Sequence, residues 1–199
     1  MDGNNESTEF LTDPWPDEIR EEVERLQGMS RGQLKRLFHS LSVPAVSEFS
    51  GEMAGVFLEQ GNAFANFLTR RLVNRGGEWL GKGFIQRDES WADGYNIYQQ
   101  SNGVLRTLQM QLHHHTETEE RLSIEYCHRQ TGLVGGISDD MKRVCDGVYL
   151  GIGRVPFFPR LAPKLERRVM FALVGPMAPA RPEAVERDVL VPQCQSEAA

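Results

Sequence analysis

Basic and phenolic side chains lie among apolar residues in the stretch from residue 104 to 130. The spacing places Arg106, His114, Tyr126 and His128 on one face of a predicted hairpin. A polar side chain among apolar neighbours needs a partner or a ligand. Arginine can anchor a negative charge, tyrosine can donate a hydrogen bond, and histidine can move a proton near neutral pH. Such a cluster would suit a carboxylate, an enolate or a phenolate.

Two roles are assigned within this predicted site, while a structural role stays open for each member. Arg106, Tyr126 and His128 are the catalytic candidates. The side chains expected to contact a ligand are Trp79, Tyr95, Tyr98, Met110, His114 and Arg154. Arg154 is included because it follows Leu150 and Ile152 at a period of two. Aromatic side chains more often pack in a core, and polar residues at the ends of a barrel can meet water or acidic groups instead.

The stretch that carries most of these residues is predicted to form two antiparallel strands joined by a polar turn. Apolar and polar residues alternate along both halves, which is typical of strands with one buried face. Residues that face each other across such a pair must lie on the same side of the sheet, so a three-residue turn at residues 117–119 fits the pattern. This register places Leu112 opposite Ile124 and Met110 opposite Tyr126.

The rest of the chain predicts more strands beside this hairpin. Strand-like segments lie at residues 51–59, 78–87, 94–101, 148–155 and 168–174, and residues 141–145 could be a strand or a helical turn. Residues 14–45 carry two helical patterns, with a capping box at Ser30 to Gln33, and residues 62–75 carry a third. We therefore expect a mainly β (α+β) fold: an antiparallel barrel or strongly curved sheet of seven or eight strands, with N-terminal helices and a helix between the first two strands.

Two glycine patterns suggest a barrel in particular. Leu-Gly-x-Gly occurs from Leu80 to Gly83 and from Leu150 to Gly153. Glycine weakens a strand unless the chain must bend sharply or another group approaches closely. Barrel closure explains both patterns, and space for a ligand inside the barrel is the functional alternative.

The residues Gly77-Glu78-Trp79 resemble the Gly-x-Trp element of lipocalin-like (calycin) barrels, and the segment from Trp79 to Gly83 is similar to the Trp-x-Gly-x-Gly opening of other small ligand-binding barrels. The resemblance covers about seven residues. In that family the motif belongs to the first strand, whereas here a strand and a helix precede it. The resemblance implies an antiparallel barrel with an apolar central cavity, and it assigns no catalytic residue.

No metal or cofactor is expected. The run from His113 to His115, followed by Glu119 or Glu120, resembles the His-x-His-x(3,4)-Glu part of the cupin motif, but the rest of that motif is missing. The predicted register also turns His113 and His115 toward the polar face. The cysteines, Cys127, Cys145 and Cys194, have no metal-like spacing.

The composition indicates which classes of function are excluded and which cellular compartment is expected. A net charge of -6 argues against a general nucleic-acid binder, which needs a basic face. Neither a signal peptide nor a transmembrane segment is apparent, and an odd number of cysteines favours a reducing compartment, so we expect a cytoplasmic protein. We predict a disordered N-terminus at residues 1–13, one barrel domain at 14–175, and a disordered tail at 176–199.

The sequence leaves three functions open. The first is binding of a small apolar, anionic ligand in a barrel cavity. The second is a cofactor-free acid/base enzyme of the isomerase, cyclase or decarboxylase type that uses the same cavity. The third is an interaction protein whose N-terminal helices dock a partner. The sequence specifies neither the ligand nor the oligomeric state, and it does not show whether the helix at 62–75 caps the cavity.

Overall fold

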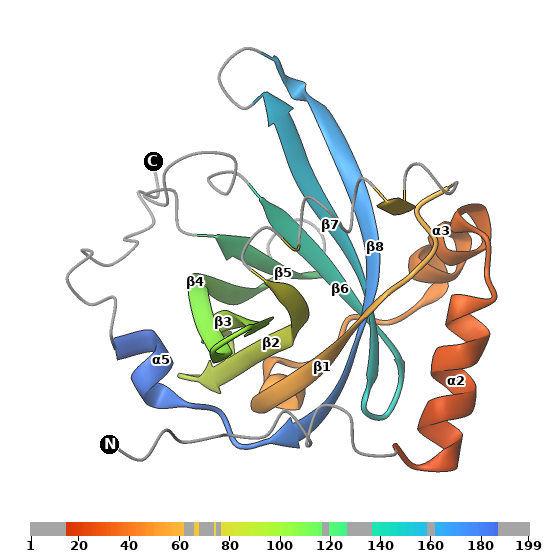
Figure 1. The fold of residues 1–199 in the computed structure, drawn as a ribbon. Coiled ribbons are helices and arrows are strands. Elements are labelled where there is room, and N and C mark those ends of the chain that lie inside the picture. The colour runs from red at the N-terminus through yellow and green to blue at the C-terminus, as the bar shows by residue number, and fades with distance from the viewer. Residues whose placement is uncertain are drawn as a thin grey trace.

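The computed structural model shows a closed barrel of eight antiparallel strands, in which each strand pairs with its neighbours in sequence and the first pairs with the last (Figure 1). The structure describes residues 15–61, 66–67, 74, 77–116, 120–126, 137–158 and 162–186, with the side chains of 156–167 and 186 left out. The strands are β1 (Gly51–Phe57), β2 (Glu78–Gln86), β3 (Trp91–Gln100), β4 (Gly103–His115), β5 (Arg121–Tyr126), β6 (Ser138–Cys145), β7 (Val148–Phe158) and β8 (Ala162–Ala178). This confirms the predicted fold class.

The N-terminal helices α2 (Asp17–Gln27) and α3 (Arg31–Ser40) pack against the outside of the barrel (Figure 1). Ser30 caps α3 through the predicted capping box with Gln33. Leu34 and Phe38 of α3 share a buried apolar cluster with Leu150 of β7. The outer faces of β7 and β8 are therefore apolar where these helices cover them.

The predicted hairpin is confirmed in its register. Leu112 lies opposite Ile124 and Met110 lies opposite Tyr126 in the β4–β5 pair. All four side chains belong to the apolar cluster inside the barrel. The turn at residues 117–119 lies outside the described residues.

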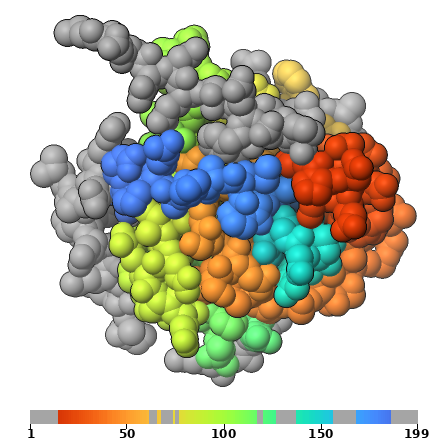
Figure 2. Space-filling model, turned by 90° about the horizontal axis from the view of Figure 1, so that it is seen from below, coloured from red at the N-terminus to blue at the C-terminus, as the bar shows by residue number. Residues whose placement is uncertain are grey.

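A short 3₁₀ helix, η1 (Val46–Phe49), closes one end of the barrel. Val46 and Phe49 are fully buried, and the Phe49 ring lies 5.5 Å from the Phe84 ring and 4.5 Å from the Tyr149 ring, between centroids. Figure 2 views this end, where atoms from distant parts of the described chain pack together. We call it the η1 end. The opposite end, where β1, β3, β5 and β7 finish, is called the loop end.

A bulge in β4 moves Arg106 to the outside of the barrel. Between Asn96↔Thr107 and Gly94↔Met110, β4 carries one more residue than β3, and Leu108 in this interval has a φ of 58°. An extra residue reverses which side of the sheet the following side chains face. The prediction that Arg106 shares a face with Met110 was therefore wrong, because it assumed unbroken alternation.

Regular structure continues past residue 175, where the sequence predicted a disordered tail. β8 runs to Ala178, and helix α5 (Pro182–Glu186) follows it. Ala184 is buried against the outside of the barrel, and Gln109 Nε2 donates a hydrogen bond to the Val185 carbonyl at 2.5 Å. Of the helix predicted at 62–75, only residues 66, 67 and 74 are described, and the first two are helical.

Candidate functional site

A buried lysine lies at the centre of the barrel. The Lys82 side chain, from β2, is 3% exposed. Its Nζ lies 3.1 Å from Asp139 Oδ2 on β6, 2.5 Å from Tyr126 Oη on β5 and 3.2 Å from Asn96 Oδ1 on β3. Because β2 neighbours neither β5 nor β6, these contacts cross the barrel interior. We call Lys82, Asn96, Tyr126 and Asp139 the Lys82 cluster.

Hydrogen-bond donors fix the orientation of Asn96. Its Oδ1 accepts from Trp79 Nε1 at 3.1 Å and from Lys82 Nζ. An indole N–H and an ammonium only donate, so the atom between them must be the amide oxygen. The amide nitrogen therefore donates to Tyr126 Oη at 3.1 Å. Tyr126 Oη thus accepts from both Asn96 and Lys82, which turns its own hydroxyl hydrogen away from both.

Aromatic rings surround the Lys82 ammonium. Its Nζ lies 4.9 Å from the centre of the Tyr126 ring, 5.7 Å from that of Phe171 and 5.9 Å from that of Trp79. The Phe171 and Trp79 rings attract the cation through their negative faces, whereas Tyr126 contacts it through its hydroxyl oxygen. The Trp79 and Phe171 rings also meet edge to face, at 5.8 Å. The cation is therefore held by one carboxylate, the Tyr126 hydroxyl and two ring faces, without bulk water.

Burial keeps the tyrosines of this region protonated. Desolvation raises the pKa of Tyr126 well above its ordinary value, and the nearby Asp139 charge raises it further. Desolvation also raises the pKa of Tyr98, with a smaller contribution from Tyr126. Both phenols are therefore hydrogen-bond donors at neutral pH, not phenolates.

The Lys82–Asp139 pair is a costly element of the barrel core. Transfer of two charges out of water costs several kcal/mol per ion in practice, about as much as their attraction returns. An apolar pair of similar size would stabilise a core at least equally well. Charged groups kept at such a position are candidates for function.

The cluster lies toward the loop end. Tyr126 is the last residue of β5 and Asp139 is the second residue of β6. Four apolar side chains that pack against the interior cluster at this end are only partly buried: Phe57, Leu105, Leu108 and Ile137.

The strand glycines accommodate aromatic rings of the protein itself. A Cβ on Gly55 would lie 2.5 Å from the Trp79 ring, and a Cβ on Gly151 would lie 2.3 Å from the Phe171 ring. Real Cβ atoms do not approach so closely. These glycines thus let the rings that surround Lys82 lie flat against the barrel wall.

The structure brings four of the predicted site residues together inside the barrel: Trp79, Tyr98, Met110 and Tyr126. Met110 Sδ lies 3.8 Å from Lys82 Nζ. His114 also faces inward, opposite Leu122, but it lies four residues beyond Met110, about 13 Å along the strand toward the η1 end. Its Nε2 is 3.5 Å from Glu120 Oε1. His128 lies outside the described residues.

Arg106 and Tyr95 lie in a different cluster, on the outside of the barrel. Arg106 Nε is 2.6 Å from Glu52 Oε1, and the Tyr95 hydroxyl donates to the same oxygen at 2.7 Å. The Arg181 backbone N–H, just before α5, donates to Tyr95 Oη at 2.8 Å. Together they attach the C-terminal segment to the barrel wall, so the expectation that both line a cavity was wrong. Tyr95 and Tyr98 are three residues apart on β3 and face opposite sides.

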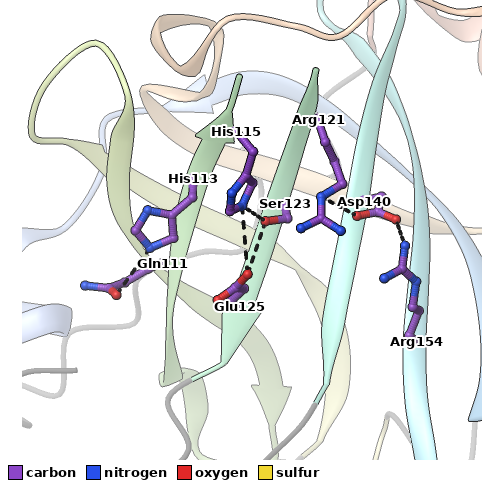
Figure 3. A network of polar contacts seen from close by, with 8 residues as sticks. All are labelled: Gln111, His113, His115, Arg121, Ser123, Glu125, Asp140 and Arg154. Carbon is purple, nitrogen blue, oxygen red and sulfur yellow. Dashed lines mark hydrogen bonds and ion pairs between the residues drawn. The ribbon is translucent and has the colours of Figure 1, made fainter. Parts of the chain in front are cut away.

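Arg154 also lies on the outer surface, where it pairs with Asp140 (Figure 3). The expectation that it shares a face with Leu150 and Ile152 was sound, but helices cover that face, and it does not line the interior. An apolar period of two cannot tell these two environments apart.

The same outer surface carries His113 and His115 (Figure 3). His115 Nε2 lies 2.7 Å from Ser123 Oγ, and Glu125 approaches that same ring nitrogen at 3.9 Å. A Ser–His–acid triad needs the acid on the other nitrogen, so this group lacks the arrangement for nucleophilic catalysis. Among the described residues, no group of three or more His, Cys, Asp or Glu side chains could hold a metal ion.

Sequence reasoning missed Lys82, Asn96 and Asp139. Strict alternation from Trp79 turns Lys82 outward, but β2 has a bulge between Trp79 and Gly81 that returns Lys82 to the inner face. Gly81 lies in this bulge with a positive φ of 151°, and the glycine at this position is the local signal that the sequence offers. Asp139 follows a stretch of glycines and precedes a second aspartate, which suggests a loop more than a buried strand.

Comparisons with known proteins support the fold and go no further. No protein-family profile and no curated protein matches the chain. A crystal structure of a protein from Thermomonospora curvata is similar, with a TM-score of 0.52 and 18% identity, over 79% of this chain and 95% of that chain. At this identity the likeness concerns the fold alone. No helix in the described part of the chain has both the length and the apolar character that crossing a membrane requires.

Proposed function

We propose that this barrel binds a small, largely apolar organic acid whose acidic group meets the Lys82 cluster. The observation that carries the proposal is the buried Lys82 ammonium, held with Tyr126 and Asn96 inside an aromatic wall. Binding sites for small molecules are mostly apolar, with a few converging polar groups that orient the ligand. Partly buried apolar residues at the loop end would contact the ligand's apolar body.

Charge balance constrains how an acid would bind. Asp139 already neutralises Lys82, so a bare carboxylate would add an unbalanced charge in a dry interior. The ligand must arrive with a proton, carried by its own carboxyl group or taken up by Asp139. The Tyr126 hydroxyl hydrogen, which neither Asn96 nor Lys82 accepts, can then donate to the ligand oxygen.

Titration calorimetry with decanoic acid and with 1-decanol tests this proposal. Both probes have the same apolar chain, but only the acid carries an ionisable group. The proposal predicts that affinity for decanoic acid falls as pH rises, while affinity for 1-decanol stays constant. The proposal would be refuted if the wild type bound neither decanoic acid nor 1-decanol more tightly than a Lys82→Met, Asp139→Asn double variant does.

An acid/base enzyme is the second candidate, and the 2.5 Å contact between Lys82 Nζ and Tyr126 Oη favours it. A proton can pass from Lys82 to Asp139 at 3.1 Å, and the Tyr126 hydroxyl, which Lys82 holds in place, can donate its hydrogen to a substrate oxygen. The test is exchange of the α-hydrogens of 2-decanone in heavy water. Exchange that is faster with the wild type than with Tyr126→Phe, at equal binding, would favour the enzyme; equal rates would favour binding alone.

A further inference from the structure

We propose that Lys82 forms an imine with the carbonyl carbon of a small, largely apolar aldehyde or ketone, with Asp139 as the counter-ion of the protonated adduct. This inference rests on the proposed function in so far as the compound enters from the loop end and places its polar group at Lys82. It adds a covalent bond and a second ligand class, carbonyl compounds.

Lys82 has the environment that a lysine nucleophile needs. An amine attacks a carbonyl carbon only when it is unprotonated, so a lysine nucleophile needs a base within reach that can accept its proton. Lys82 is buried, and Asp139 Oδ2 at 3.1 Å can take its proton. Lys35, by contrast, is exposed on α3.

The chemistry balances within the cluster. A proton passes from the Lys82 ammonium to Asp139, and the free Nζ electron pair forms a bond to the carbonyl carbon. The carbonyl oxygen becomes a hydroxyl by taking a proton from Asp139, while the nitrogen still carries the positive charge. Transfer of a nitrogen proton to that hydroxyl releases water and leaves a protonated imine. The sum is ammonium plus carbonyl giving protonated imine plus water.

The adduct keeps the charge pattern of the barrel interior. One positive charge on Nζ is replaced by one positive charge on the same nitrogen, so Asp139 stays paired. The faces of Phe171 and Trp79 attract a planar cation as they attract the ammonium. A neutral carbonyl compound therefore needs no extra proton, unlike a carboxylate.

Tyr126 is placed to assist the reaction. Its hydroxyl accepts from Lys82 and Asn96, so its hydrogen is available to polarise the carbonyl oxygen. Burial holds the pKa of this phenol high, which keeps the hydrogen in place. The same group that would orient an acid would thus activate a carbonyl.

Reductive trapping tests the inference on the full-length protein. Limiting decanal is added with sodium cyanoborohydride, which converts an imine to a stable amine, and peptide mass spectrometry then locates the adduct among the four lysines. The expected result is more adduct on Lys82 than on exposed Lys35. Asp139→Asn should lower the Lys82 adduct and leave Lys35 unchanged, and Tyr126→Phe should slow labelling of Lys82 alone.

A parallel measurement separates this inference from the proposed function. Retention of 1-decanol by native mass spectrometry reports binding without covalent chemistry. If 1-decanol were retained but the decanal adduct were found only on Lys35, the imine would be overturned and the proposed binding site would still be supported. If the protein neither retained 1-decanol nor formed an adduct on Lys82, both the imine and the proposed binding function would be overturned. The comparison of Lys82 with Lys35 is made in the wild-type protein, so it tests the imine even if one of the variants does not fold.

Discussion

Lys82 Nζ and Asp139 Oδ2 lie 3.1 Å apart on strands β2 and β6, so this ion pair spans the interior of the barrel. Both side chains are almost completely buried. Each charged side chain stabilises the other, because an unpaired charge buried in apolar surroundings is so unfavourable that the group would become neutral. The pair therefore links the stability of the barrel to its candidate function.

Removal of one member of the pair should destabilise the protein more than removal of both. Lys82→Met leaves the Asp139 carboxylate buried and unpaired, at a cost of about 3–5 kcal/mol. Adding Asp139→Asn removes the orphan charge and should restore part of the loss. Urea denaturation of the single and double variants measures the difference. A double variant as unstable as the sum of the singles would show that the two charges do not interact.

Alkaline pH should unfold the protein before its tyrosines ionise. Burial raises the pKa of all four tyrosines, namely Tyr95, Tyr98, Tyr126 and Tyr149. Above about pH 10 the unfolded chain releases phenolic protons that the folded chain retains, so the free energy of unfolding falls as pH rises.

Tyrosinate absorbance and circular dichroism, followed together, check this prediction. The two signals should change in one transition, above the pH at which free tyrosine ionises. A gradual rise in tyrosinate absorbance near pH 10, with the fold intact, would contradict it; an increase in the urea midpoint over the same range would contradict the sign.

Gly151→Ala should destabilise the barrel, because the new methyl group would lie 2.3 Å from the Phe171 ring. The ring forms part of the wall around Lys82 and would have to move, at a cost of about 1–3 kcal/mol. Gly32→Ala is the matched control, since its Cβ would meet nothing closer than Arg36 at 3.7 Å. Thermal denaturation of both variants should show a loss for the first and no loss for the second. Equal behaviour would mean that Phe171 adjusts freely.

Arg106→Ala should affect stability and leave ligand binding intact. The Glu52 carboxylate is 1% exposed, and loss of its arginine partner should cost about 3 kcal/mol. The pair lies outside the barrel, on the opposite side of the wall from Lys82. The affinity for decanoic acid should therefore match the wild type under conditions where the variant is folded. A selective loss of affinity would place Arg106 in the binding site after all.

The β4–β5 hairpin shows what the sequence could predict. Met110, Leu112 and Ile124 alternate strictly with polar residues, and the register that follows is the observed one. The outer surface of β4 and β5 at this point carries polar side chains, among them His113, His115 and Glu125 (Figure 3). A clear contrast between two faces is the condition under which a period of two identifies the interior.

Two structural features prevented the rest of the candidate site from being predicted from the sequence. Bulges in β2 and β4 shift the alternation by one residue, which brings Lys82 inward and turns Arg106 outward. Helices cover the outer face of β7, so Ile152 and its neighbour Arg154 could not be placed by hydrophobicity. Both features depend on contacts between distant segments, which local patterns do not record.

Native mass spectrometry of the purified protein, before and after incubation with decanoic acid, tests the central claim most directly. The account predicts an added mass of organic size that disappears on denaturation, and its loss in the Lys82→Met, Asp139→Asn double variant. A chain that stays at its sequence mass under both conditions, or that holds the probe equally well without Lys82 and Asp139, would contradict it.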